Sequence, residues 1–276
     1  MRKLLFLTAL IYLSACSTSS KKEVESAEAE DTAVTDTKPV GQDDVEIKKD
    51  APIASSMYAA LNESIKQQND EQIQKASGEI LTQNPKDLRA LNSLALVYYK
   101  RGRFEAAQYL LNKALSANPK SSEVYGNLGT VMLAKGDRRE AVKMFRKALE
   151  INPDDSLVGA NLGAIYVQEK DYNKALLALE IPVRKGMKDQ KVLNNYAISL
   201  VAKARPKEAA EIYEKILKEN PANKEVMLNF AILQIDELKK YKQGLDLLNR
   251  LKFVGPPSES RQVIKELEIK AKAGLQ

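Results

Sequence analysis

The sequence of 276 residues contains no histidine, no tryptophan and a single cysteine, Cys16. Without imidazole, the chain lacks the side chain that most often serves as a general base at neutral pH and as a zinc ligand. One cysteine allows neither a disulfide framework within the chain nor a cysteine-based metal site. A glycine-rich phosphate loop is also missing. We therefore expect no catalytic residues, no metal and no cofactor.

Aromatic side chains are scarce as well, at 6% of the residues, whereas 44% are hydrophobic and 29% are charged. This is enough apolar material for a packed core, and the length allows one or two ordinary domains. Abundant Ala, Leu, Lys and Glu with few aromatics is typical of a helical protein. The composition therefore predicts an all-α fold.

The first sixteen residues have the pattern of a secretory signal. Arg2 and Lys3 precede an apolar stretch at 4–13, which is too short to remain as a membrane-spanning helix. The ending Leu-Ser-Ala-Cys16 resembles the lipobox of bacterial lipoproteins. The resemblance implies removal of a signal peptide at 1–15 and acylation of Cys16, with palmitate-like chains that anchor the protein stably. The alternative is an ordinary cleaved signal that leaves Cys16 unmodified.

The residue after the cysteine influences the membrane to which such a lipoprotein is sorted. In the lipoprotein family, Asp at that position tends to retain the protein at the inner membrane, and here the residue is Ser17. The resemblance therefore implies a lipid anchor in the outer membrane, with the folded part facing the periplasm. Residues 16–52 are polar and acidic, so we predict a disordered tether. As a flexible coil it would reach roughly 30–35 Å.

From residue 53 onward the sequence repeats with a period of 34. Its clearest marker is the dipeptide Asn-Pro, which begins at Asn84, Asn118, Asn152 and Asn220. Asn tolerates the left-handed conformation that closes a helix, and Pro cannot continue one, so each pair predicts a helix end.

Small residues recur at two phases of the same period, twelve residues apart. One series is Ala95, Gly129, Gly163, Ala197 and Ala231, and the other is Ala107, Ala141, Ala175 and Ala209. Large apolar residues surround both series with helical spacing. We expect two antiparallel helices per unit that touch where the small side chains lie, and neighbouring units that share one core.

This period and its motifs resemble the tetratricopeptide-repeat family. The resemblance implies an all-α, right-handed superhelical solenoid with a C-terminal capping helix at 259–276. About six repeats are expected within 53–258, at 54–87, 88–121, 122–155, 156–189, 190–223 and 224–258. In the fourth, Pro182 predicts that the second helix ends or kinks near Ile181. In the sixth, one extra residue is expected around 238–240.

In this family the first helix of each repeat lines a concave face, where partners bind. Two sets of residues are candidates for partner binding there. A ladder of amides can hydrogen-bond the backbone of an extended peptide; it comprises Asn127, Asn161, Asn195 and Asn229, with Asn194 alongside. An apolar wall can form a binding strip; it comprises Leu96, Tyr99, Leu133, Val167, Val201 and Ile235. The alternative for both sets is packing between neighbouring repeats.

The charge is unevenly distributed. The chain carries +6 overall, of which the signal contributes +2 and residues 17–52 about −5, so the repeats carry about +9. A basic body favours acidic partner surfaces, and we expect neither nucleic acid nor a small-molecule substrate.

The combination of lipobox, tether and repeats resembles pilotin lipoproteins of type IV pilus systems and lipoproteins of gliding-motility complexes. The segment 192–197, Val-Leu-Asn-Asn-Tyr-Ala, is similar to pilotins. The resemblance implies a non-catalytic scaffold that helps an envelope machine assemble or dock, with secretin or motility-complex subunits as partners. An alternative is an adaptor that recruits peptidoglycan hydrolases or synthases. Catalysis by the carboxylates of Asp154 and Asp155 is a third, although such residues more naturally cap a helix.

Overall fold

The computed structural model describes residues 54–276. Within this range the chain is helical throughout, with no strand, which confirms the predicted all-α repeat fold. None of the helices in this range is both long enough and apolar enough to cross a membrane. The predicted signal peptide at 1–15, the lipidation of Cys16 and the tether at 16–52 lie outside the described residues.

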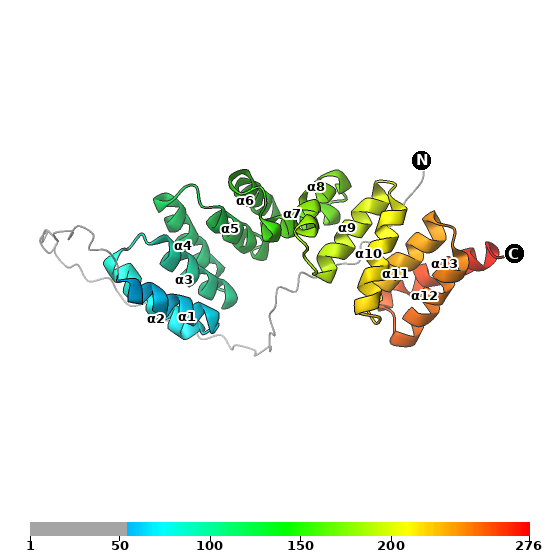
Figure 1. Cartoon of the computed structure of the whole chain (residues 1–276), viewed down its shortest axis with the longest axis horizontal. Helices are drawn as coiled ribbons and strands as arrows, with labels where there is room; N and C mark the ends of the chain where they lie inside the picture. The colour runs from blue at the N-terminus through cyan, green and yellow to red at the C-terminus, as the bar shows by residue number, and fades with distance from the viewer. Residues whose placement is uncertain (1–53) are drawn as a thin grey trace, which may run out of the picture. The chain divides into compact units, whose positions relative to one another are not determined.

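Twelve helices and a final helix follow one another along the described chain (Figure 1). Two of them lie within each of the six expected ranges. They are α1 (Ser55–Lys66) and α2 (Asp70–Gln83), α3 (Leu88–Lys100) and α4 (Phe104–Ala117), α5 (Ser122–Ala134) and α6 (Arg138–Ile151), α7 (Ser156–Gln168) and α8 (Tyr172–Arg184), α9 (Gln190–Ala202) and α10 (Pro206–Glu219), and α11 (Lys224–Ile232) and α12 (Tyr241–Val254). The final helix is α13 (Arg261–Ala273).

The chain divides into two compact units after Arg103, so the boundary falls between α3 and α4, inside the second expected repeat. The described part of the first unit is α1 to α3, around a core that includes Leu61, Ile73 and Ile80. The side chain of Asp87 organises its third helix: Oδ1 accepts from the backbone N of Ala90 at 2.8 Å. A capping bond of this kind satisfies one of the free N–H groups at the start of a helix.

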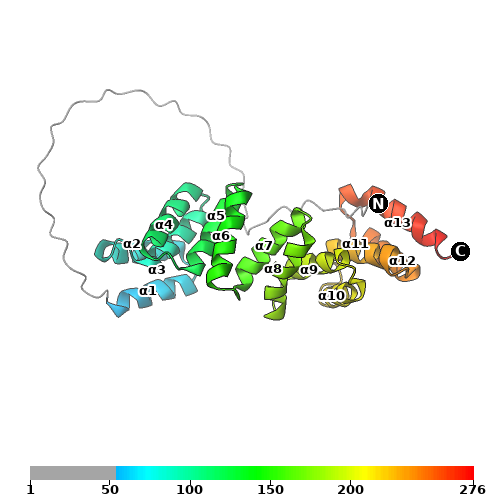
Figure 2. The same ribbon diagram turned by 90° about the horizontal axis from the view of Figure 1, so that it is seen from above.

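In the second unit α5 lies beside α6 and α7 beside α8 (Figures 1 and 2), and both pairs approach closely at predicted small residues. A Cβ added to Gly129 of α5 would lie 2.7 Å from ring carbons of Phe145 in α6, and one added to Gly163 of α7 would overlap the side chain of Leu179 in α8. The facing residues are fully buried. The small side chains are therefore required by close packing of the helix pair.

The Asn-Pro motifs end their helices by a different mechanism from the one expected. At Asn84, Asn152 and Asn220, φ lies between −129° and −134°, which is extended and not left-handed. The side-chain oxygen of Asn84 instead accepts from the backbone N of Lys86 at 3.0 Å, and that of Asn118 from Lys120 at 3.2 Å. Asn ends the helix through this local side-chain turn.

Left-handed residues occur instead in the turn inside each pair. One residue with positive φ lies in each of these six turns; they are Gln68, Gly102, Gly136, Lys170, Ala204 and Lys239. A left-handed residue lets the chain reverse directly after a helix. The prediction of left-handed closure at the Asn-Pro pairs is therefore wrong for Asn84, Asn152 and Asn220, and the left-handed residues of the turns within repeats were not predicted.

We expected α8 to end or kink near Ile181; it does not end there, because it continues through Pro182 to Arg184. Pro182 removes only the N–H that would bond to the carbonyl of Ala178. Gly159 of α7 lies against this carbonyl, since an added Cβ would be 2.8 Å from its oxygen. The proline comes late in the helix, and the remaining turn closes with a bond from Met187 N to Pro182 O at 2.9 Å.

The extra residue of the sixth repeat lies earlier than predicted. The segment η1 (Leu233–Glu237) follows α11 directly and has π-helical bonding. A π-turn holds one more residue than an α-turn, so it accommodates the insertion inside the first helix of the pair. Asp236 of this turn forms an ion pair with Lys270 of α13, which ties the final helix to the sixth repeat.

Candidate functional site

The first helices α5, α7, α9 and α11 of the second unit form a row, and all five residues of the predicted amide ladder lie on it. Neighbouring members of the row contact each other between α5 and α7 and between α7 and α9. The side chains of Asn127 and Asn161 are half-buried. Small residues lie next to them, with Gly126 before Asn127 and Ala160 before Asn161. These two amides lie where a partner can reach them.

Asn194 and Asn229 form hydrogen bonds within the protein. Asn194 is 2% exposed, and its Nδ2 donates to Oε1 of Glu225 at 2.8 Å. Nδ2 of Asn229 donates to Oδ1 of Asn194 at 3.0 Å. These bonds join α9 to α11, so this part of the ladder links the fifth repeat to the sixth, which was the alternative interpretation.

Asn195 is 5% exposed, and its Oδ1 has no hydrogen-bond partner among the described residues. The prediction that Asn194 and Asn195 offer surface amides does not fit this burial.

The carboxylate of Glu225 titrates differently from an exposed one. Burial raises its pKa above the ordinary 4.5, while the positive charge of Lys191 and the hydrogen bond from Asn194 act in the opposite direction. Removing a carboxylate from water disfavours its charged form, and here this effect is the largest. The charge of Glu225 therefore reduces the stability of the link between α9 and α11 near neutral pH.

The predicted apolar wall divides into accessible and buried members. Leu96 and Tyr99 of the first unit are half-buried, as is Leu133 of the second. Val167, Val201 and Ile235 are at most 6% exposed and belong to the core. The accessible members of the wall are therefore Leu96, Tyr99 and Leu133, and Ile235 packs on Gly244 within its own repeat.

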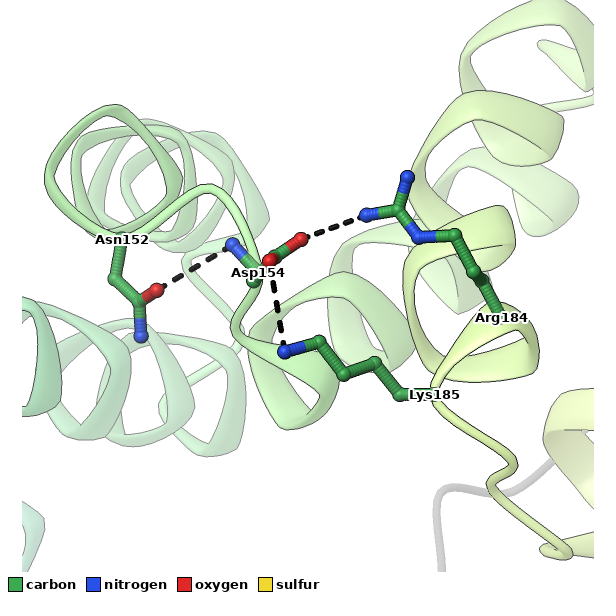
Figure 3. A network of polar contacts seen from close by, with 4 residues as sticks. All are labelled: Asn152, Asp154, Arg184 and Lys185. Atoms are coloured by element: carbon green, nitrogen blue, oxygen red, sulfur yellow. Dashed lines mark hydrogen bonds and ion pairs between the residues drawn. The ribbon is translucent and has the colours of Figure 1, made fainter.

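Both carboxylates considered for catalysis have structural partners, and Figure 3 shows those of Asp154. Asp155 caps α7, because its Oδ1 accepts from the backbone N of Leu157 and of Val158, both at 3.1 Å. Asp154 pairs with Arg184 at 2.6 Å and with Lys185 at 3.5 Å, at the end of α8. Its backbone N also donates to the side-chain oxygen of Asn152 at 3.4 Å. Asp155 thus caps the first helix of the fourth repeat, and Asp154 ties the turn before that helix to the end of α8.

Among residues 54–276, no group of three or more acidic or cysteine side chains is arranged to hold a metal ion.

Comparison with known protein families matches residues 65–129 and residues 125–239 to two models, both described as tetratricopeptide repeat. The chain carries tetratricopeptide repeats. A search of curated proteins gives no match.

Many solved structures share this repeat fold. YrrB, described as a tetratricopeptide-repeat protein with an unusual peptide-binding site, is 20% identical with a TM-score of 0.62, over 72% of this chain and 98% of YrrB. PilF of Pseudomonas aeruginosa is 23% identical with a TM-score of 0.53, over 68% and 88%. MamA is 20% identical with a TM-score of 0.54, over 64% and 97%. At these identities the similarity concerns the fold.

One accessible residue on the row of first helices was not predicted from the sequence. Leu157, at the start of α7, is 71% exposed. The residues one period before and after it are Glu123 and Lys191, both charged and exposed. Comparing residues at steps of 34 could have found it, because Leu157 is the apolar exception among charged equivalents. With Asn161 one helical turn later, it gives α7 both an apolar and an amide contact.

Polar contacts also link some second helices to the first helix of the next repeat. Lys135, directly after α5, pairs with Glu105 of α4 at 3.5 Å and donates to Oε1 of Gln108 at 2.7 Å. Between α6 and α7, Nη2 of Arg138 donates to Oε1 of Gln168 at 3.0 Å. These contacts are exposed, so each contributes little to stability.

Proposed function

We propose that this protein is a non-catalytic scaffold that binds an extended segment of a partner protein along α5 and α7. Tetratricopeptide-repeat proteins generally mediate protein–protein interaction, and the fold here is of that kind. The observation that carries the proposal is the accessible pair Asn127 and Asn161, one period apart, beside the exposed Leu157.

The chemistry of this face suits a peptide backbone. A side-chain amide offers two N–H donors and a carbonyl acceptor, which match the C=O and N–H groups of an extended chain. Ala160 and Ala164, on either side of Asn161, are half-buried and leave room for a backbone to approach α7. Leu157 supplies an apolar contact, and the amides contact the backbone of the bound segment but not its side chains. We infer that the face holds a segment by its backbone, with modest sequence preference.

We further propose that the scaffold is anchored in the outer membrane through an acylated Cys16 and assists the assembly or docking of an envelope machine. The support lies in the lipobox-like ending at Cys16, in Ser17, and in the segment 192–197 that is similar to pilotins. The partners proposed are envelope proteins, such as secretin subunits of a type IV pilus or subunits of a gliding-motility complex. The repeats would then act from the periplasmic side.

A crosslinking experiment in the native envelope tests the binding face. Leu157→benzoylphenylalanine places a photoreactive group at the proposed face, and Leu177→benzoylphenylalanine places one on the second helix of the same repeat, where the native side chain is 69% exposed. We expect a defined protein crosslink from position 157 and none from position 177. Equal crosslinking from both positions, or none from 157, would contradict the proposed face.

The identity of the crosslinked protein tests the finer proposal. Pilus or motility subunits support it, whereas peptidoglycan hydrolases or synthases establish the adaptor role instead. The double variant Asn127→Ala with Asn161→Ala should lower the crosslink yield, since each lost hydrogen bond weakens binding by about 1 kcal/mol. A Cys16→Ser variant should lose acyl labelling and leave the membrane fraction.

A further inference from the structure

A separate surface lies at the end of α12, where a large apolar side chain stands in solvent. Phe253 is 93% exposed, the highest value among the exposed large hydrophobic residues described. Beside it, the turn between α10 and α11 and the last turns of α12 enclose an open cavity of about 470 Å³. The residues that line this cavity, the Phe253 pocket, are Pro221, Ala222, Met227, Asn249, Arg250, Phe253 and Val254.

Contacts between α11, α12 and the turn before α11 define the pocket. Met227 of α11 lines it and is fully buried. Nη2 of Arg250 donates to the carbonyl of Pro221 at 3.2 Å and joins α12 to the turn between α10 and α11. Gly255, with φ of 81°, ends α12 directly after Val254. The cavity therefore lies between this turn and the end of α12, next to Phe253.

The charges at the pocket have one sign. Of its seven lining residues, all within the described chain, one is a cation and none is acidic. The bond to Pro221 uses a single donor of Arg250, and a guanidinium has five. Lys224 adds a second cation, since its Nζ lies 3.8 Å from the position of a Cβ added to Gly255. An apolar cavity with cations at its edge fits an apolar side chain whose neighbours are carboxylates.

We propose that the Phe253 pocket binds an acidic segment of a partner protein. An aliphatic or aromatic side chain of that segment fills the cavity against Phe253 and Met227, and its flanking carboxylates contact Arg250 and Lys224. Exposed aromatic and Arg side chains beside a cavity are the usual energetic centre of a protein interface.

The pocket differs from the face on α5 and α7 in position and chemistry. It lies between the turn that precedes α11 and the two helices of the sixth repeat, and it would bind side chains, whereas the proposed amide face lies on the first helices of the third and fourth repeats. Either surface can therefore fail experimentally while the other holds.

Fluorescence anisotropy with the full chain tests the proposal. The probe is a labelled peptide, acetyl-Asp-Glu-Asp-Leu-Phe-Asp-Glu-amide, and two control peptides carry Lys in place of each acid or Ser-Ser in place of Leu-Phe. We expect saturable binding of the acidic probe. Each control peptide should bind at least about tenfold more weakly.

Two variants locate the binding on the protein. Phe253→Ser and Arg250→Gln should each raise the probe Kd about tenfold, and Gln at 250 can still donate to the carbonyl of Pro221. Leu177→Ser is the matched control, because Leu177 is also an exposed apolar residue on a second helix. This control and the double variant of Asn127 and Asn161 should bind the probe as the unmodified chain does.

Three results would overturn the proposal. One is equal affinity for the charge-reversed peptide, and another is unchanged binding by Phe253→Ser with an unchanged circular dichroism spectrum. The third is a concentration-dependent dimer in sedimentation equilibrium that Phe253→Ser abolishes, which would assign the pocket to a second copy of the chain.

Discussion

The side-chain amide of Asn229 donates a hydrogen bond to the side-chain carbonyl of Asn194, at 3.0 Å, and thereby joins α11 to α9. Asn194 in turn donates to Glu225, which also belongs to α11. Two bonds therefore converge on one buried amide and connect the fifth repeat to the sixth. In an array of repeats, stability depends on such contacts between nearest neighbours.

Replacing Asn194 by Ala should lower the free energy of unfolding by about 1–3 kcal/mol, because Glu225 and Asn229 would each lose a partner at a partly buried site. Urea unfolding followed by far-ultraviolet circular dichroism measures this change. Asn173→Ala is the matched control, since Asn173 is exposed on α8, and it should change stability by less than about 0.5 kcal/mol. Equal unfolding midpoints for the two variants would show that the amide contributes little.

Replacing Glu225 by Gln should raise stability at neutral pH. Burial raises the pKa of Glu225 in the folded chain above its ordinary value, so the ionised carboxylate destabilises the fold once the pH exceeds the folded pKa. As the pH falls through that pKa toward the ordinary 4.5, the folded protein takes up the proton and the penalty disappears. Gln keeps an acceptor for Asn194 without the charge.

Urea midpoints of the unmodified chain and of Glu225→Gln, measured from neutral to acid pH, test this. The variant should be the more stable near neutrality, and the difference should shrink on acidification. A difference that grows toward acid pH would reverse the assigned sign and make the attraction of the Lys191 charge the dominant effect.

Adding a methyl group at Gly163 should destabilise the fourth repeat. The new Cβ overlaps the side chain of Leu179, so Gly163→Ala should cost about 1–3 kcal/mol. Gly78→Ala is the opposing case, because no atom lies within 4 Å of a Cβ at that position in α2. It should raise stability by about 0.5–1 kcal/mol, as Ala does for Gly inside a helix. Thermal unfolding of both variants checks whether the two signs differ.

Adjacent carboxylates should have unequal effects on stability. Asp155→Ala removes the cap of α7 and should cost about 1 kcal/mol. Asp154 is 52% exposed and makes only surface ion pairs, so Asp154→Ala should cost about 0–1 kcal/mol and mostly at low salt. Unfolding at low and high salt separates them. If Asp154→Ala lost more stability than Asp155→Ala, the network of Figure 3 would contribute more to the free energy of unfolding than surface ion pairs usually do.

The sequence predicted most of the fold because close packing restricts the residues that it uses. Gly129 opposite Phe145 and Gly163 opposite Leu179 leave no room for larger side chains, and this constraint recurs every 34 residues. Turn chemistry was harder to predict. Asn84 has both a side chain that forms a local turn and a tolerance for left-handed backbone, and composition does not show which property is used.

The candidate site was only partly predictable, since equal positions in the repeat have unequal surroundings. Asn127 and Asn195 lie two periods apart, but the first is half-buried and the second is 5% exposed. The residue before each differs, with Gly126 in one case and the hydrogen-bonded Asn194 in the other. Accessibility depends on the side chains of adjacent repeats, which the 34-residue pattern does not specify.

The π-turn at Leu233–Glu237 changes what an insertion does to this protein. An additional residue inside an ordinary α-helix rotates everything after it by about 100°, which would turn a buried face outward. Here the surplus is confined to one widened turn, and Leu247, Leu248 and Leu251 of α12 still reach the interior. The last helix pair therefore keeps its packing, and the fold can accept one additional residue at this point without change.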